Sequence, residues 1–201
     1  MKNRILLNVL ILLVFTTYSC KKEVKEAAKA RYSIETKTTT INWTAYKTTA
    51  KIPVKGIFKE VQVTNTKTVE NPFDVLNGLS FSVPVNSIDT KNVDRDTKII
   101  QSFFGTMKDT QVLKGTLSLD EKGKGIINLT MNGITFKLPM TYIISGQLAE
   151  INATLKLDNW QTKLAIDALN KVCEDKHKGE DGISKTWNEV AIHIVSYLKV
   201  E

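Results

Sequence analysis

After residue 32, apolar and polar residues alternate along this chain in a series of short runs. Because successive side chains of a β-strand point to opposite faces, a period of two predicts strands with one apolar face. In five such runs the apolar members share one parity: Ile41, Trp43, Ala45; Phe81, Val83, Val85; Leu117, Leu119; Ile134, Phe136, Leu138, Met140; and Val190, Ile192, Ile194. Asn132-Gly133 is a strong hairpin signal, because both residues tolerate positive φ. The pattern predicts an all-β antiparallel sandwich or barrel of eight or nine strands.

Two segments instead carry apolar residues at helical spacing and predict two short helical excursions. In Lys98–Lys108 these residues are Ile99, Ile100, Phe103, Phe104 and Met107. Asn92 or Asp94 can cap this helix, because their side chains accept hydrogen bonds from the free N–H groups of a first turn. The second segment is Asn159–Cys173, where the stripe is Leu164, Ala165, Ala168, Leu169 and Val172. Asp158 or Asn159 is the expected cap there.

The N-terminus has the pattern of an export signal. Basic Lys2 and Arg4 precede an apolar run that ends at Phe15, and this run is shorter than the roughly 20 residues that span a bilayer. Ser19-Cys20 resembles a bacterial lipobox, in which the cysteine is acylated; cleavage by an ordinary signal peptidase is the alternative. We therefore expect a lipoprotein signal peptide over 1–19, a lipidated tether over 20–31 and one domain over 32–201. This arrangement implies a membrane-anchored lipoprotein of the bacterial cell envelope, in the periplasm or on the outer membrane.

Charge and cysteine content narrow the possible partners. The formal net charge of +7 falls to +5 without Lys2 and Arg4, and the lysines are scattered along the chain. Nucleic-acid binding requires a clustered basic face, so we expect no nucleic-acid partner. If Cys20 carries lipid, Cys173 is the single remaining cysteine and no intrachain disulfide can form.

Several motifs of the chain, taken in order, resemble the YceI-like family. They are Tyr32–Glu35, Ile41–Lys47, Val54–Phe58, Ser87–Asp96 with Phe103-Phe104, and Leu129–Thr135. The resemblance covers about Tyr32 to Val200. It implies an extended lipocalin-like eight-stranded antiparallel β-barrel, whose elongated apolar cavity holds a long isoprenoid chain or a similar lipid. An eight-stranded barrel has interior space for one small ligand.

The chain departs from the family pattern at two places. Lys98 stands where the family often has a histidine. The segment 158–182, with Cys173 and His177, replaces the family's usual arginine–x–aspartate–phenylalanine–glycine stretch. This segment could reshape one mouth of the barrel, and we expect it to be the contact for any envelope protein partner.

Aromatic and basic residues are the candidate ligand contacts. The expected cavity lining is Trp43, Phe58, Phe81, Phe103, Phe104 and Phe136, although the same residues could form an ordinary filled core. Arg95 and Lys98 are expected at the rim, where they would meet an anionic head group. The alternative for this segment is a capped helix start in which Arg95 pairs with a neighbouring carboxylate.

Catalytic and metal sites are not expected. His193 has the parity opposite to Ile192 and Ile194, so it should face solvent. His177 and Cys173 are four residues apart but do not complete a zinc site, and the simpler interpretation is a buried Cys173 with a surface His177. Nucleophile elbows and phosphate-binding loops are also missing from the sequence. The leading hypothesis is therefore non-enzymatic binding or transport of a long apolar lipid; the alternative is a structural or interaction module with a filled core.

Overall fold

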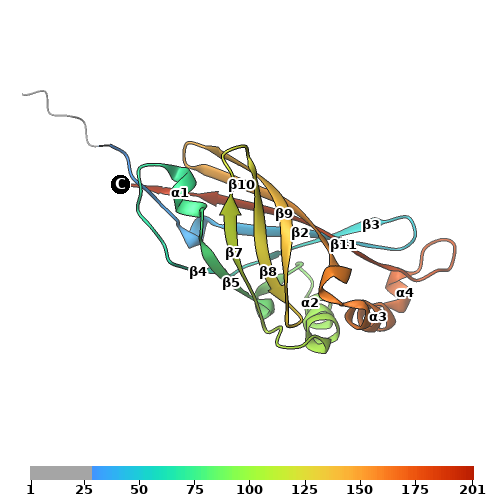
Figure 1. The fold of residues 1–201 in the computed structure, drawn as a ribbon. Helices are drawn as coiled ribbons and strands as arrows, with labels where there is room; N and C mark the ends of the chain where they lie inside the picture. Colours follow the sequence, from blue (N-terminus) through green and yellow to red (C-terminus); the bar gives the residue numbers. More distant parts are fainter. Residues whose placement is uncertain (1–28) are drawn as a thin grey trace, which may run out of the picture.

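The computed structural model describes residues 29–201. The predicted signal peptide, the lipidation site Cys20 and most of the predicted tether lie outside these residues. Ten strands form one curled antiparallel sheet in the order β4-β5-β7-β8-β9-β10-β11-β2-β3-β6 (Figure 1). Their bounds are β2 Thr40–Lys47, β3 Ile52–Phe58, β4 Gln62–Thr64, β5 Ser80–Pro84, β6 Ile88–Asp89, β7 Val112–Leu119, β8 Lys124–Met131, β9 Ile134–Ser145, β10 Leu148–Lys156 and β11 Thr186–Tyr197.

The sheet closes on itself through the stretch that contains β5 and β6. Only the 3₁₀ turn η2, Val85–Ser87, separates these two strands. The first part of the stretch pairs with β7 and the second with β3, so the two sides of the sheet meet. The amide of Lys59 adds a 2.9 Å hydrogen bond to the carbonyl of Ser87 at this seam. The predicted antiparallel barrel is therefore confirmed.

The predicted number of strands was slightly low. Eight strands of the sheet have five or more residues, and these correspond to the predicted barrel. The two further strands, β4 and β6, have three and two residues. A two-stranded pair, β1 Tyr32–Ser33 with β12 Lys199–Val200, is equally short. Strands of this length are too short for an alternating pattern, so the sequence does not reveal them.

Alternation places the core inside the barrel, as predicted. In β10 the buried residues are Ala149, Ile151, Ala153 and Leu155, and the polar residues between them face outward. The buried members of β8 are Ile127, Leu129 and Met131. A cross-strand register without a slip through β8, β9 and β10 keeps one parity inside over the whole wall.

The helices gather mainly at one end of the barrel. Figure 1 shows α2, α3 and α4 at the end away from the C-terminus, whereas α1, Pro72–Leu76, lies near the opposite end. Helix α2 spans Val93–Lys98, α3 spans Lys163–Val172 and α4 spans Glu174–His177. In the part of the chain from 29 to 201, no helix is both long and apolar enough to cross a membrane.

The first helical segment starts at the cap predicted for it, although the apolar stripe covers only its second half. Asn92 is its N-cap, and its side-chain oxygen accepts a 2.9 Å hydrogen bond from the amide of Arg95. Asp94, the alternative cap, lies inside the first turn. After α2 the chain continues as a π-helix, η3 Ile99–Phe103, and a 3₁₀ turn, η4 Phe104–Thr106. Apart from Val93, the residues of α2 are polar and form no apolar stripe. The sequence pattern therefore located only the η3 and η4 part of this helical segment.

The cap predicted for the second helix was wrong. Asp158 and Asn159 belong to a separate 3₁₀ turn, η5 Leu157–Trp160. This turn ends at Gln161, whose backbone is in the left-handed region with φ of 54°. Helix α3 starts only after Thr162. The predicted apolar stripe is also only partly buried: Ala165 is 2% exposed, whereas Leu164 is 78% exposed. The helix meets the barrel through Ala165, Ile166 and Leu169.

The last residues of the predicted tether are attached to the barrel domain. The backbone of Arg31 exchanges hydrogen bonds of 3.2 and 2.9 Å with Glu201, next to the β1–β12 pair. The Arg31 guanidinium also donates to the carbonyl of Thr68 at 2.6 Å. The described chain thus joins the barrel one residue before the predicted domain boundary at 32.

Candidate functional site

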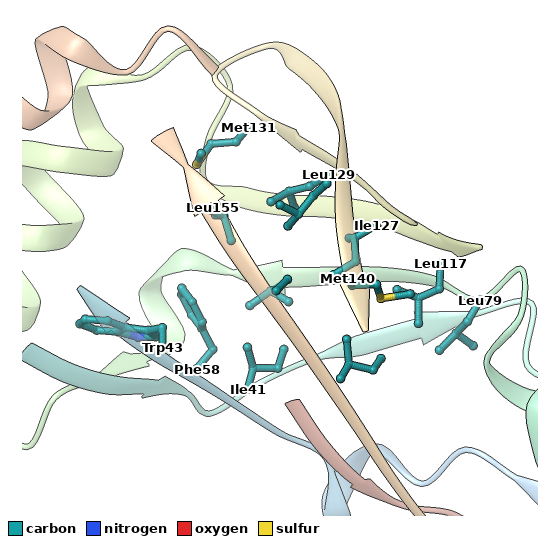
Figure 2. Close-up of a cluster of buried hydrophobic side chains, with 14 of the residues drawn as sticks. Ile41, Trp43, Phe58, Leu79, Leu117, Ile127, Leu129, Met131, Met140 and Leu155 are labelled. Atoms are coloured by element: carbon teal, nitrogen blue, oxygen red, sulfur yellow. The ribbon is translucent and has the colours of Figure 1, made fainter. Parts of the chain in front are cut away.

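The barrel encloses an apolar cavity of about 210 Å³. It extends from Leu76, the last residue of α1, to Leu169 on α3 at the helical end. Figure 2 shows part of the cluster of buried side chains on the inner wall. The polar side chains at the wall are few, and most have partners: Thr39 shares a 2.8 Å hydrogen bond with Ser196, and Thr186 donates to Asn170 at 2.8 Å. The interior is therefore hollow, and its lining is apolar and aromatic, as is usual at sites that bind apolar ligands.

Five of the six aromatic side chains predicted to line a cavity do so. These are Trp43, Phe58, Phe81, Phe103 and Phe104. Phe136 does not line it, although its parity is inward. Its ring instead packs edge-on against Trp160, with a centroid distance of 5.4 Å. Trp160 is fully buried and comes from η5, a contact 24 residues away that alternation within one strand cannot predict.

Two of the lining aromatic rings lie over glycines of the neighbouring strand. Trp43 on β2 is paired with Gly56 on β3, and Phe81 on β5 with Gly115 on β7. A Cβ atom at Gly56 would lie 2.3 Å from Cζ2 of Trp43, and one at Gly115 would lie 2.6 Å from Cζ of Phe81. Because the glycines lack side chains, the rings lie against the wall. This arrangement leaves the middle of the barrel open.

The π-helix η3 brings two consecutive aromatic residues to the cavity. Phe103 and Phe104 are 9% and 8% exposed, and their rings meet edge-on at a centroid distance of 5.0 Å. The ring of Phe104 also packs against that of Phe58 on the cavity wall, with a centroid distance of 6.5 Å. Helix α3 packs against η3 at this end of the barrel. π-Helical turns are rare and occur often at functional sites.

Arg95 and Lys98 lie on α2, directly before η3. Within residues 29–201 neither forms a salt bridge, so the predicted alternative of an Arg95–carboxylate pair is wrong. Asp96 is engaged elsewhere: its Oδ1 accepts from the amide and hydroxyl of Thr90 at 2.9 and 2.7 Å. The helix start is thus capped as expected, and its two cations remain available.

His177 is half-buried at the same end of the barrel, which corrects the prediction of a surface histidine. Its Nδ1 lies 2.7 Å from Oγ1 of Thr186 and 3.3 Å from Oδ1 of Asn170. The pKa of His177 is lowered from 6.5 to about 4, mainly because burial disfavours the charged imidazolium. Repulsion from the nearby cations Lys47, Arg95 and Lys98 lowers it further. His177 is therefore neutral near pH 7.

His177 lies near the two predicted rim cations and near a third cation, Lys47, that sequence reasoning missed. Lys47 donates to the carbonyl of Lys176 at 2.9 Å, which holds the end of β2 against α4. Its strand partner Thr186 lines the cavity. We call Lys47, Arg95 and Lys98 the helical-end cations. Residues 47 and 95 are far apart in sequence, so no local pattern could have joined them.

The other polar groups of the segment 158–182 have structural contacts. Cys173 is buried, as expected. The carboxylate of Asp181 accepts a 2.6 Å hydrogen bond from the Thr49 hydroxyl. Lys178 forms a salt bridge with Glu174, with 3.4 Å between Nζ and Oε1. Across residues 29–201, no group of three His, Cys, Asp or Glu side chains is placed to hold a metal ion. His193 is exposed on β11, as its parity predicts.

Comparison with known proteins agrees with this architecture. The family model of the YceI-like domain matches residues 32–195. A polyisoprenoid-binding domain from Saccharophagus degradans has a TM-score of 0.61 at 12% identity, covering 85% of this chain and 98% of that one. BcnA from Burkholderia cenocepacia has a TM-score of 0.52 at 13% identity, covering 83% and 99%. No curated protein matches the chain. At such identities the two structures establish the fold, and the family match, which spans most of the chain, shows that the chain belongs to the YceI-like family.

Proposed function

We propose that the protein binds or carries a long apolar lipid of isoprenoid type inside its barrel, without catalysing a reaction. The observation that carries this proposal is the apolar cavity of about 210 Å³, at which the rings of Trp43 and Phe81 pack against Gly56 and Gly115. Burial of apolar surface contributes about 25 cal/mol per Å², so a chain molecule can bind there without any reactive group. The fold shared with a polyisoprenoid-binding domain supports the same ligand class.

The helical-end cations would meet the polar end of such a lipid. Arg95 and Lys98 have no carboxylate partner among residues 29–201, and repulsion from them and from Lys47 contributes to the low pKa of His177. Anionic groups bind strongly to guanidinium and ammonium donors. We propose that Arg95 and Lys98 contact an anionic or strongly polar head group outside the apolar cavity.

The place of action would be the bacterial cell envelope. An acylated Cys20 would anchor the chain to a membrane, and several acyl chains would make that anchoring stable. Residues 20–28 would then link the anchor to the barrel end at which Arg31 and Glu201 meet. Labelling of the intact chain with an alkyne fatty acid tests this: Cys20→Ala should abolish the label, and a label that persists would contradict lipidation at this residue.

A substitution that fills the cavity tests lipid binding. Ala45 on β2 lines the cavity, whereas Ala191 on β11 has the outward parity. Ala45→Phe should weaken binding of the apolar dye nile red and of a polyprenyl alcohol by tenfold or more, because the added ring occupies the ligand's space. Ala191→Phe adds the same ring outside and should leave both affinities within about twofold. Equal affinities for the two variants, both shown to be folded by circular dichroism, would refute an internal binding site.

An interaction with another envelope protein is the second candidate. It is favoured by exposed apolar residues on the segment 158–182 and just after it: Leu164 and Val172 on α3 are 78% and 45% exposed, and Ile183 is 56% exposed. Single exposed apolar residues are common, but three on one short segment favour a contact surface. Leu164→Ser combined with Ile183→Ser should abolish co-purification of such a partner and leave dye binding unchanged. Retained co-purification would remove this surface from consideration.

A further inference from the structure

The indole N–H of Trp43 is a buried donor without an acceptor. The residue is 7% exposed, and within residues 29–201 its Nε1 has no hydrogen-bond partner. An indole N–H can donate but not accept, and buried tryptophans usually satisfy it. The other orphaned side-chain atom, Oγ1 of Thr48, belongs to the β2–β3 turn and does not line the cavity. Trp43 is therefore the unusual group of the cavity wall.

The other two tryptophans show how the same fold satisfies an indole. Nε1 of Trp160 donates to the carbonyl of Leu129 at 3.0 Å. Nε1 of Trp187 donates to the carbonyl of Thr48 at 2.7 Å. Trp43 and Trp187 both line the cavity, but within residues 29–201 only Trp43 lacks a backbone carbonyl for its indole N–H. A partner for its N–H must come from the cavity.

The neighbours of Trp43 on the barrel wall offer its indole N–H no free acceptor. Its ring lies on Gly56, and the methyl group of Thr90 lies on the same glycine. The Thr90 hydroxyl is already engaged with Asp96 at 2.7 Å. Nε1 itself is covered by neighbouring atoms, so the ring must tilt away from Gly56 to present its N–H to the cavity. Figure 2 shows Trp43 beside Phe58, on the inner wall.

We propose that Trp43 is a specificity-determining residue that donates its indole N–H to an uncharged oxygen of the bound lipid. The inference rests on the proposed function and narrows the ligand class. The lipid would carry a hydroxyl, carbonyl or ether oxygen within the apolar cavity, separate from any head group at Arg95 and Lys98. A pure hydrocarbon chain would leave the donor unsatisfied, which is costly in a buried site. Trp43 thereby favours oxygenated chains over hydrocarbons of the same shape.

Nuclear magnetic resonance of ¹⁵N-labelled tryptophan tests the donor directly. The chain has three tryptophans, so the indole region holds three signals, and Trp43→Phe identifies the one of interest. Addition of phytanol, a branched-chain alcohol, to delipidated protein should move the Trp43 proton downfield. The signals of Trp160 and Trp187 should stay in place, because their carbonyl partners do not change. A Trp43 signal that stays in place while phytanol displaces nile red would overturn the proposal.

A ratio of affinities tests specificity independently of cavity shape. Phytanol and phytane share one carbon skeleton and differ by the hydroxyl group. In the intact protein the preference for phytanol over phytane should exceed that in Trp43→Phe by about fivefold, the effect of one hydrogen bond. Phe104→Leu, a control that changes the apolar wall only, should weaken both ligands and keep the ratio. An unchanged ratio in Trp43→Phe would refute the role of Trp43 but not lipid binding, whereas failure of both compounds to displace nile red would refute both proposals.

Discussion

At the scale of the residue, the glycines opposite the aromatic rings control the space inside the barrel. A methyl group at Gly56 would lie 2.3 Å from the Trp43 ring, far inside van der Waals contact. Gly56→Ala should therefore lower the free energy of unfolding by about 1–3 kcal/mol through overpacking. This exceeds the gain of about 0.4–1 kcal/mol that alanine brings by restricting the unfolded chain.

Urea denaturation measures this effect, and Lys55→Ala is the matched control. Lys55 is the preceding residue on β3 and is exposed, so its substitution should change stability by no more than about 0.5 kcal/mol. The tryptophan fluorescence emission maximum should also shift in Gly56→Ala, because the added methyl group displaces the Trp43 ring from its position against residue 56. A Gly56→Ala protein as stable as the wild type would mean that the ring does not lie on this glycine.

His177 should make stability depend on pH between about 4 and 6.5. Its pKa in the folded chain is about 4, below the ordinary 6.5, so the unfolded state binds more protons in this range. Stability from His177 is therefore fully present above pH 6.5 and is lost as the pH falls towards 4. For a fully buried histidine, the loss of unfolding free energy between pH 6.5 and 4 would be about 3 kcal/mol. Because His177 is only half-buried, solvent screens its charge and we expect a loss of about 1–2 kcal/mol.

The comparison of two histidine variants isolates this contribution. Urea denaturation of wild type and His177→Gln at pH values from 4 to 7 should show a smaller decline in the variant. His193→Gln removes the other histidine, which is exposed on the outer face, and serves as the matched control. These are the two histidines of the chain, so no third can obscure the result. Parallel curves for all three proteins would contradict the depressed pKa.

At the scale of the element, the start of α2 depends on one side chain. Asn92 accepts a hydrogen bond from the amide of Arg95, a group that otherwise has no partner within the helix. Asn92→Ala should cost about 1 kcal/mol of stability, and Asn92→Ser should restore most of it. Asp94→Ala is the control, because Asp94 is exposed and makes no capping bond. Thermal denaturation that ranks Asp94→Ala as the more damaging change would contradict the capping assignment.

Elements with a long regular pattern could be predicted from the sequence, and irregular elements could not. The alternation along β2, β9 and β11 identifies the inward residues, because every second side chain of a strand faces the same way. The break at Gln161 and the mostly polar turn Val93–Lys98 leave no such pattern, so the start of α3 was misplaced and α2 was not recognised as part of the first helical segment. The same holds for the two- and three-residue strands.

At the scale of the whole molecule, the candidate site combines groups that the sequence keeps apart. Five lining aromatic residues follow from parity or helical spacing, whereas Phe136 is diverted by Trp160 from a later turn. Lys47 and His177 join Arg95 and Lys98 only through the packing of β2, β11, α4 and α2. Whether the inside is hollow or filled was left open by alternation, and the glycines opposite Trp43 and Phe81 are what leave it hollow.

The central claim is that the barrel contains a lipid, and native mass spectrometry of the protein purified from a bacterial envelope tests it most directly. We expect one long apolar lipid for each chain, and organic extraction followed by mass spectrometry should identify it as an oxygenated isoprenoid. The barrel should release this mass on denaturation. A protein that is empty, and that stays empty after incubation with isoprenoid quinones and polyprenyl phosphates, would contradict the claim and favour the interaction module.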